Sequence, residues 1–222
     1  MRRRLFAAVL ALAFGFAFVS NARAQRILVP MDLTQSNHLK AYGLAFTALS
    51  KGHKIDWLLN YRGGSFVMPA TADVVLDARL KNVSFVEISG SELAQIHAEI
   101  AQNNMEIVNL EKAPKVAVYI PPLKQPWDDA VTLALEYAEV PYARVFDEEV
   151  LAGGLDKYDW IHLHHEDFTG QYGKFYAAYR HTDWYQADQR DSEARARALG
   201  FNKVSDVKKA VAHVKKKKPK NV

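Results

Sequence analysis

The chain alternates between short runs of β-branched and aromatic residues and longer amphipathic runs at helical spacing. Strands are expected over 26–31, 55–59, 84–89, 115–120, 142–146 and 159–164. Helices are expected over about 37–51, 70–81, 90–102 and 126–140, then over a short acidic segment after 146 and over most of the remainder, with a break near Gly200. Strands that alternate with crossover helices are typical of a parallel sheet. The sequence therefore predicts a flavodoxin-like α/β fold, with a parallel sheet and helices on both of its faces.

The first 24 residues are expected to be a cleaved export signal. Arg2, Arg3 and Arg4 precede the apolar run Leu5–Val19, and small residues follow as far as Ala24. This run is shorter than a typical membrane-spanning helix. We therefore expect cleavage near Ala24, a periplasmic or secreted protein, and no transmembrane segment. One α/β domain is expected over 25–214, followed by a basic, disordered tail over 215–222.

Charge and cysteine content exclude several functions. Lys and Arg together number 29 against 25 for Asp and Glu. Four of the arginines lie in the expected signal and five of the lysines lie in the tail, so the body between them is mildly acidic. This distribution argues against a nucleic-acid partner. The chain has no cysteine, which excludes thiol nucleophiles, disulfide bonds and Cys-ligated zinc from its chemistry.

A cluster of histidines and carboxylates follows the last expected strand. It contains His162, His164, His165, Glu166 and Asp167. On an extended strand His162 and His164 point to one face, where they could ligate one Zn²⁺ ion. Without a metal, the same groups could bind a polar substrate. A third interpretation makes them hydrogen-bonded structural residues beneath the aromatic segment that follows.

A glycine pair next to an arginine forms a second candidate site. Arg62, Gly63 and Gly64 follow the second expected strand. Backbone N–H groups at paired glycines can converge on an anion, and the guanidinium of Arg62 would add a positive charge. Paired glycines also serve ordinary tight turns. In a parallel sheet the loops 30–32, 60–66, 121–126 and 164–173 would lie at the carboxyl edge, where α/β folds bind ligands.

Aromatic residues are frequent from Phe168 to Tyr179, and Trp184 and Tyr185 follow shortly after. Their rings could line a cleft or stack on sugar rings. They could equally form part of a core, or a lid packed against the sheet.

Several segments together resemble an exported bacterial family often labelled asparagine synthetase B. The matching segments are 30–32 with 37–43, 57–66, 124–132 and 160–179. The resemblance spans roughly residues 26 to 213 and implies a class I glutamine-amidotransferase-like fold. Full-length members of the family continue into a glycine-rich strand and a cysteine-bearing turn, where this chain has its lysine-rich end. The resemblance therefore implies a fold that is incomplete at its C-terminus.

The chemistry of an asparagine synthetase is not expected of this chain. Synthesis from glutamine needs a cysteine nucleophile and a nucleotide-pyrophosphate loop. The chain has no cysteine, and Gly63-Gly64-Ser65 lacks the acidic continuation of such a loop.

Three functions stay open. The leading one is a polar cleft, not catalytic on its own and without a cofactor, that binds a small polar ligand or a protein partner. Its walls would be Arg62 with the glycine pair on one side and the histidine cluster on the other. The second is a zinc-dependent hydrolase that uses His162 and His164. The third is a structural protein whose sheet edge pairs with another chain.

Overall fold

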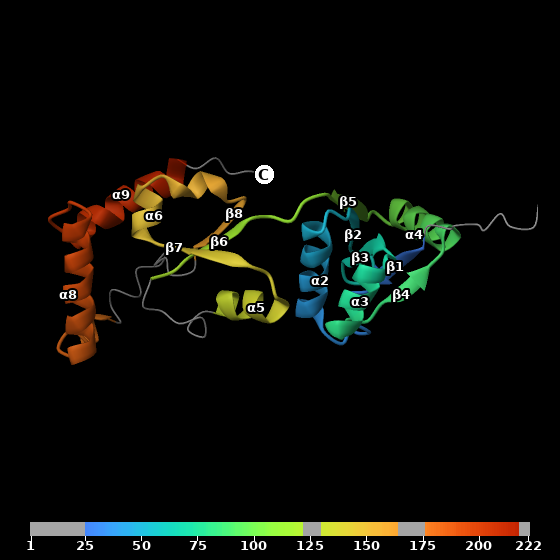
Figure 1. Cartoon of the computed structure of the whole chain (residues 1–222), viewed down its shortest axis with the longest axis horizontal. Helices are drawn as coiled ribbons and strands as arrows, with labels where there is room; N and C mark the ends of the chain where they lie inside the picture. The colour runs from blue at the N-terminus through green and yellow to red at the C-terminus, as the bar shows by residue number, and fades with distance from the viewer. Residues whose placement is uncertain (1–24, 122–129, 164–175, 218–222) are drawn as a thin grey trace, which may run out of the picture. The chain divides into compact units, whose positions relative to one another are not determined.

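The computed structural model describes residues 25–121, 130–163 and 176–217. The chain divides into two compact units, the first ending at Glu111 and the second beginning at Lys112 (Figure 1). The sequence predicted one domain over 25–214, and this stays a prediction. The predicted export signal and residues 218–222 lie outside the described residues. Residues 215–217, predicted to begin the tail, are the last residues of a helix.

From residue 25 onward, where the structure describes it, the first unit has five strands and three helices. In chain order they are β1 (Arg26–Val29), α2 (His38–Ser50), β2 (Ile55–Leu59), β3 (Ser65–Pro69), α3 (Ala72–Leu80), β4 (Val86–Ile88), α4 (Gly90–Gln102) and β5 (Glu106–Leu110). The strand order is β4-β1-β3-β2-β5, and every neighbouring pair is antiparallel. The first six elements follow the βαββαβ order of the split-βαβ, or ferredoxin-like, arrangement.

This sheet shows that the predicted single parallel sheet, flavodoxin-like or amidotransferase-like, is wrong. The strands β3 and β5 were not predicted. Both pair antiparallel with β2, so missing them hid the antiparallel sheet. Strand β3 follows β2 after a short hairpin loop and inserts between β1 and β2. The helix-linked strands β1 and β2 still run in the same direction, but the antiparallel β3 separates them. The protein is therefore α/β with one antiparallel sheet and one parallel sheet.

Both faces of the first sheet are covered, which gives three layers. Successive side chains of a strand point to opposite faces. On one face Leu28, Leu58 and Val67 pack against Ile96 and Ile100 of α4. The other face carries α2 and α3, and its buried residues are Ile27, Val29, Phe66 and Met68. This double burial explains why β1 and β3 are nearly continuous apolar runs.

The second unit holds a parallel sheet of three strands among its described residues. In chain order the elements are β6 (Val116–Tyr119), α5 (Ala130–Ala138), β7 (Tyr142–Val145), α6 (Asp147–Leu151), the 3₁₀ turn η2 (Gly154–Lys157), β8 (Trp160–Leu163), α8 (Asp183–Ala198) and α9 (Val204–Lys217). The order is β7-β6-β8, with both pairs parallel. The first crossover therefore leads from β6 to β7, and the second returns from β7 past β6 to β8 on its other side.

One hydrophobic cluster of the second unit lies on one face of this sheet, and Val116 and Val118 are buried on the other. In this cluster Ala117 and Val145 pack with Val150 and with Val207 and Val211 of α9. The spacing of the two α9 valines is one turn of a helix, so α9 lays a single apolar stripe on the cluster. No helix in the described ranges is long and apolar enough to cross a membrane.

Candidate functional site

The hairpin loop between β2 and β3 has an unusual backbone. Asn60, Arg62, Gly63 and Gly64 adopt positive φ angles of 64°, 45°, 80° and 94°. Glycine adopts such angles readily, but arginine pays a steric penalty because its Cβ crowds the backbone. A non-glycine residue held in this region is a reason to look for a function nearby. Arg62 is therefore the focus of the candidate site.

The same loop lies directly against the backbone that follows β1. The Met31 N–H donates to the Arg62 carbonyl oxygen at 3.1 Å. A Cβ atom at Gly63 would lie 2.4 Å from the Met31 carbonyl oxygen, which is too close for any side chain. The close approach gives Gly63 a packing role. It also explains how Arg62 comes next to residues that lie 30 positions earlier in the chain.

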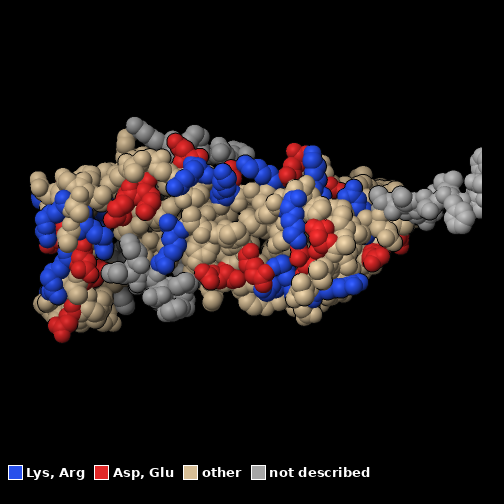
Figure 2. Space-filling view, in the orientation of Figure 1, with Lys and Arg blue, Asp and Glu red and all other residues tan. Residues whose placement is uncertain are grey.

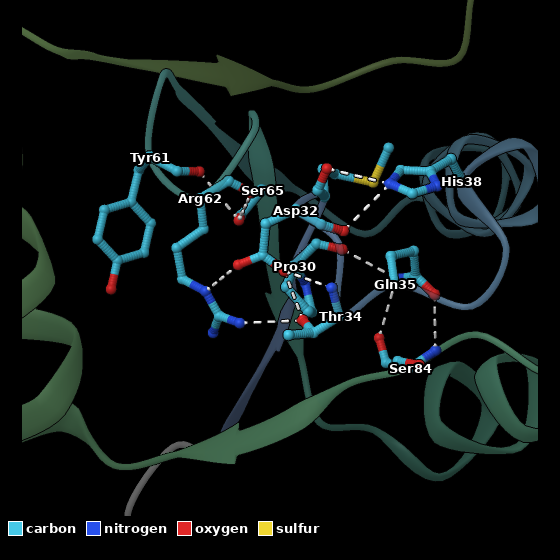
Figure 3. Close-up of polar contacts among 10 residues, drawn as sticks. Pro30, Asp32, Thr34, Gln35, His38, Tyr61, Arg62, Ser65 and Ser84 are labelled. Carbon is cyan, nitrogen blue, oxygen red and sulfur yellow. Dashed lines mark hydrogen bonds and ion pairs between the residues drawn. The ribbon is translucent and has the colours of Figure 1, made fainter.

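Arg62 is held by two residues of the β1–α2 loop (Figure 3). Its Nε donates to Asp32 Oδ2 at 2.7 Å, and its Nη2 donates to Thr34 Oγ1 at 3.1 Å. The Thr34 N–H and hydroxyl both donate to Asp32 Oδ1. The hydrogen bond from Arg62, followed by those from Thr34, lowers the Asp32 pKa to about 2. Asp32 is thus ionised at neutral pH, and we call Asp32, Thr34 and Arg62 the polar corner.

The polar corner keeps some hydrogen-bonding capacity. Nη1 of Arg62 has no hydrogen-bond partner among the residues that the structure describes, and Figure 3 draws no contact to it. The carboxylate Oδ2 of Asp32 accepts one hydrogen bond and has room for a second. The side chains of Arg62 and Asp32 are 34% and 31% exposed, so solvent reaches both. The corner therefore presents donors and an acceptor side by side.

Buried polar contacts fix the loop that carries Asp32. The side chain of Gln35 is buried; its Nε2 donates to the carbonyl oxygens of Pro30 at 2.9 Å and of Ser84 at 3.2 Å. Its Oε1 accepts the Ser84 N–H at 2.9 Å. Nε2 of His38 lies 3.1 Å and 3.2 Å from the carbonyl oxygens of Met31 and Asp32. Because carbonyl oxygens only accept, this nitrogen carries a hydrogen and donates to them.

Sequence reasoning placed loops 30–32 and 60–66 at one edge, and the contact between Asp32 and Arg62 confirms that they meet. The reason differs from the predicted one. The strands β1 and β2 run in the same direction, so their carboxyl ends lie at one edge even though the sheet is antiparallel. Thr34, Gln35 and His38 were not singled out. Thr34 and Gln35 lie between the first expected strand and the cap of the next helix, and His38 is the first residue of that helix.

The histidine cluster is only partly described. His162 lies on β8, beside Val118 in the register, and its ring centroid is 6.2 Å from that of Trp160. His164, His165, Glu166 and Asp167 lie outside the described residues. Within the described ranges, no group of three or more His, Asp or Glu side chains could hold a metal ion. A zinc site at His162 and His164 stays a prediction, as does a cleft shared with Arg62, which belongs to the other unit.

No protein-family model, curated protein or solved structure matches the chain. The function of the polar corner is therefore inferred from its geometry and not from a related protein.

Proposed function

We propose that the protein is an exported binding protein, not catalytic on its own, whose first unit holds a small polar ligand at the polar corner. The observation that carries the proposal is the anchoring of Arg62. One edge of its guanidinium is fixed by Asp32 and Thr34, while Nη1 makes no hydrogen bond to another described residue. A guanidinium that is already oriented loses little further freedom when it binds a ligand.

The chemistry of the corner favours a ligand with a carboxylate beside an amine or hydroxyl group. The carboxylate would accept from the free N–H groups of Arg62, which suit planar oxygen pairs. The amine or hydroxyl would donate to Asp32 Oδ2. Since Asp32 and Arg62 carry opposite charges, the corner is close to neutral, and a zwitterion or hydroxy acid matches it better than a strong anion. Amino acids and small hydroxy acids are the compounds that we propose.

We also propose that the chain is related to the exported proteins labelled asparagine synthetase B, without their named activity. Two of the segments that carry this resemblance, 30–32 and 57–66, supply Asp32 and Arg62 of the polar corner. The absence of cysteine supports a binding role over glutamine-dependent synthesis.

The test is a titration of the purified mature protein with the common amino acids and with short hydroxy acids, followed by calorimetry. We expect at least one compound to bind and to raise the melting temperature. The Arg62→Lys variant keeps the charge but loses the fork of donors, so affinity should fall at least tenfold.

A matched control is Lys54→Gln, which removes an exposed ion pair with Glu111 in the same unit. Its affinity for the ligand should stay within twofold of the wild type. The proposal fails if no compound binds, or if the Arg62 and Lys54 variants bind equally well.

A further inference from the structure

Four aromatic rings gather at the beginning of α8 in the second unit. Tyr176, Tyr179, Trp184 and Tyr185 make up this aromatic platform. The centroid of the Trp184 ring lies 6.2 Å from that of Tyr176, 5.8 Å from that of Tyr179 and 5.9 Å from that of Tyr185. The corresponding interplanar angles are 63°, 45° and 86°, so the phenol rings meet the indole at steep angles. Trp184 is thus the central ring, held in place by three neighbours.

The platform is exposed although it is made of large rings. Trp184 is 51% exposed, and Tyr176 and Tyr179 are each 39% exposed. The only buried residue of α8 is Ala196, near the other end of the helix. None of the four rings belongs to the hydrophobic cluster around Val145 and Val150. The rings contact one another, and Tyr176 and Tyr179 make further interactions besides.

Polar residues of both charges lie close to the rings in the sequence. Arg180, Asp183, Gln186 and Gln189 are exposed on the same short stretch of chain. Figure 2 shows acidic and basic side chains interspersed over α8. Together these groups supply hydrogen-bond donors and acceptors without a strong net charge. The exposed large apolar side chains from 176 to 214 are all aromatic, with no leucine, isoleucine or valine among them.

We propose that the aromatic platform binds a neutral saccharide, with a sugar ring stacked on Trp184. One face of a pyranose ring presents C–H groups, which are attracted to the electron-rich face of an indole. The hydroxyl groups around its edge need both donors and acceptors, and the polar residues of this stretch of chain supply both. Rings that are already braced lose little rotamer freedom on binding. This site is independent of the polar corner.

The test is calorimetric titration of the mature full-length protein with neutral hexasaccharides of glucose, xylose, mannose and N-acetylglucosamine, with tryptophan fluorescence as a second signal. We expect at least one of them to bind and to change the fluorescence. Trp184→Ala should lower that affinity at least tenfold, and Trp184→Phe should lower it less because a ring remains. Tyr179→Ala, which leaves the indole in place, should weaken binding by a smaller factor.

Tyr137→Ala is the matched control, because Tyr137 is a 49%-exposed tyrosine on α5, outside the platform. Its affinity should stay within twofold of the wild type. Circular dichroism and melting curves establish that each variant is folded; if Trp184→Ala does not fold, Trp184→Phe and Tyr179→Ala decide the question.

Four results would overturn the proposal. The first is the absence of binding by any of the hexasaccharides at millimolar concentration. The second is binding that the Trp184 and Tyr179 variants leave unchanged. The third is self-association, measured by sedimentation, that Trp184→Ala abolishes while saccharide binding is absent, since the platform would then dock a second copy of the chain. Loss of saccharide binding in the Arg62→Lys variant alone would likewise assign the sugar to the polar corner.

Discussion

The two units use the same alternation of strands and helices, yet they build opposite kinds of sheet. In the first unit every strand pair is antiparallel, whereas in the second both pairs are parallel. The helix-linked strands run in the same direction in both, as β1 and β2 do and as β6 and β7 do. The difference comes from one hairpin, 60–64, which places β3 between β1 and β2. A single short connection can therefore change the class of a sheet.

The comparison extends to how each sheet is covered. Helices pack on both faces of the first sheet, and its central strands are almost fully buried. In the second unit the central strand β6 is also buried on both faces, with Val116, Ala117 and Val118 at most 4% exposed. Parallel strands normally need this cover on both faces.

The largest effect should come from the loops that reverse the chain. Gly63→Ala would place a Cβ against the Met31 backbone, in addition to the strain of a positive φ. Gly153→Ala, before η2, has a similar φ of 77° but nothing within 4 Å. We expect losses of about 3 kcal/mol or more for Gly63 and about 1 kcal/mol for Gly153, measured by urea unfolding. Equal losses would mean that the loop of the first unit relaxes away from β1.

Valine truncations in the two sheets should have the next largest effects. Val67 in β3 and Val118 in β6 are both 0% exposed. Replacing either with alanine should cost about 1.5 to 2.5 kcal/mol through lost burial and the cavity left behind. Hydrogen exchange should show each loss in the unit that carries the substitution. Loss of protection in both units from either change would show that they unfold as one.

Helix capping gives a smaller contrast. Ser89 caps α4 in a capping box with Glu92, and Ser89→Ala should destabilise the first unit by about 1 kcal/mol. The Thr182 side chain makes no capping bond to α8, so Thr182→Ala should cost less. Thermal melting of both variants provides the measurement. A greater loss at Thr182 would contradict the capping argument.

The smallest effect should be the acid dependence of the polar corner, because solvent screens it. The folded-state pKa of Asp32 is lowered to about 2, chiefly by the hydrogen bond from Arg62. Its stabilising contribution is therefore present above the unfolded-state pKa near 3.8, and is lost as the pH falls towards 2. Asp32→Asn should be less stable than the wild type at pH 6, and the difference should shrink between about pH 4 and pH 2. Denaturant melts across this range test it, and a constant difference would rule out the carboxylate as its source.

Much of the element order could be predicted from the sequence. The strand at 55–59 and the helix at 90–102 were predicted with the bounds that the structure has, and the break near Gly200 was also correct. Periodicity, caps and glycines are local signals, and they report local structure well.

The pairing of the strands could not be predicted in this way. The β3 sequence Ser-Phe-Val-Met-Pro is a short apolar run between a glycine and a proline, so it looked like part of a loop. The β5 sequence, Glu-Ile-Val-Asn-Leu, mixes exposed and half-buried positions and gives no clear alternation. Missing these two strands removed the evidence for an antiparallel sheet.

The candidate site was predicted in part for a similar reason. Arg62 and its glycines stood out locally, whereas the roles of Asp32 and Thr34 depend on a contact across the strands. No local pattern marks a carboxylate that will meet an arginine 30 positions later.

The contact between the Arg62 loop and the end of β1 also has a consequence for the order of events during synthesis. Asp32 leaves the ribosome early, but its partner arrives only after the hairpin has formed and β3 has paired with β1. A nascent chain that stops before Ser65 contains all three residues of the polar corner, yet it lacks β3, the strand that brings them together. Binding at the corner would therefore begin only after β3 has paired with β1. A bound ligand would then stabilise the folded first unit and not any earlier, partly folded state.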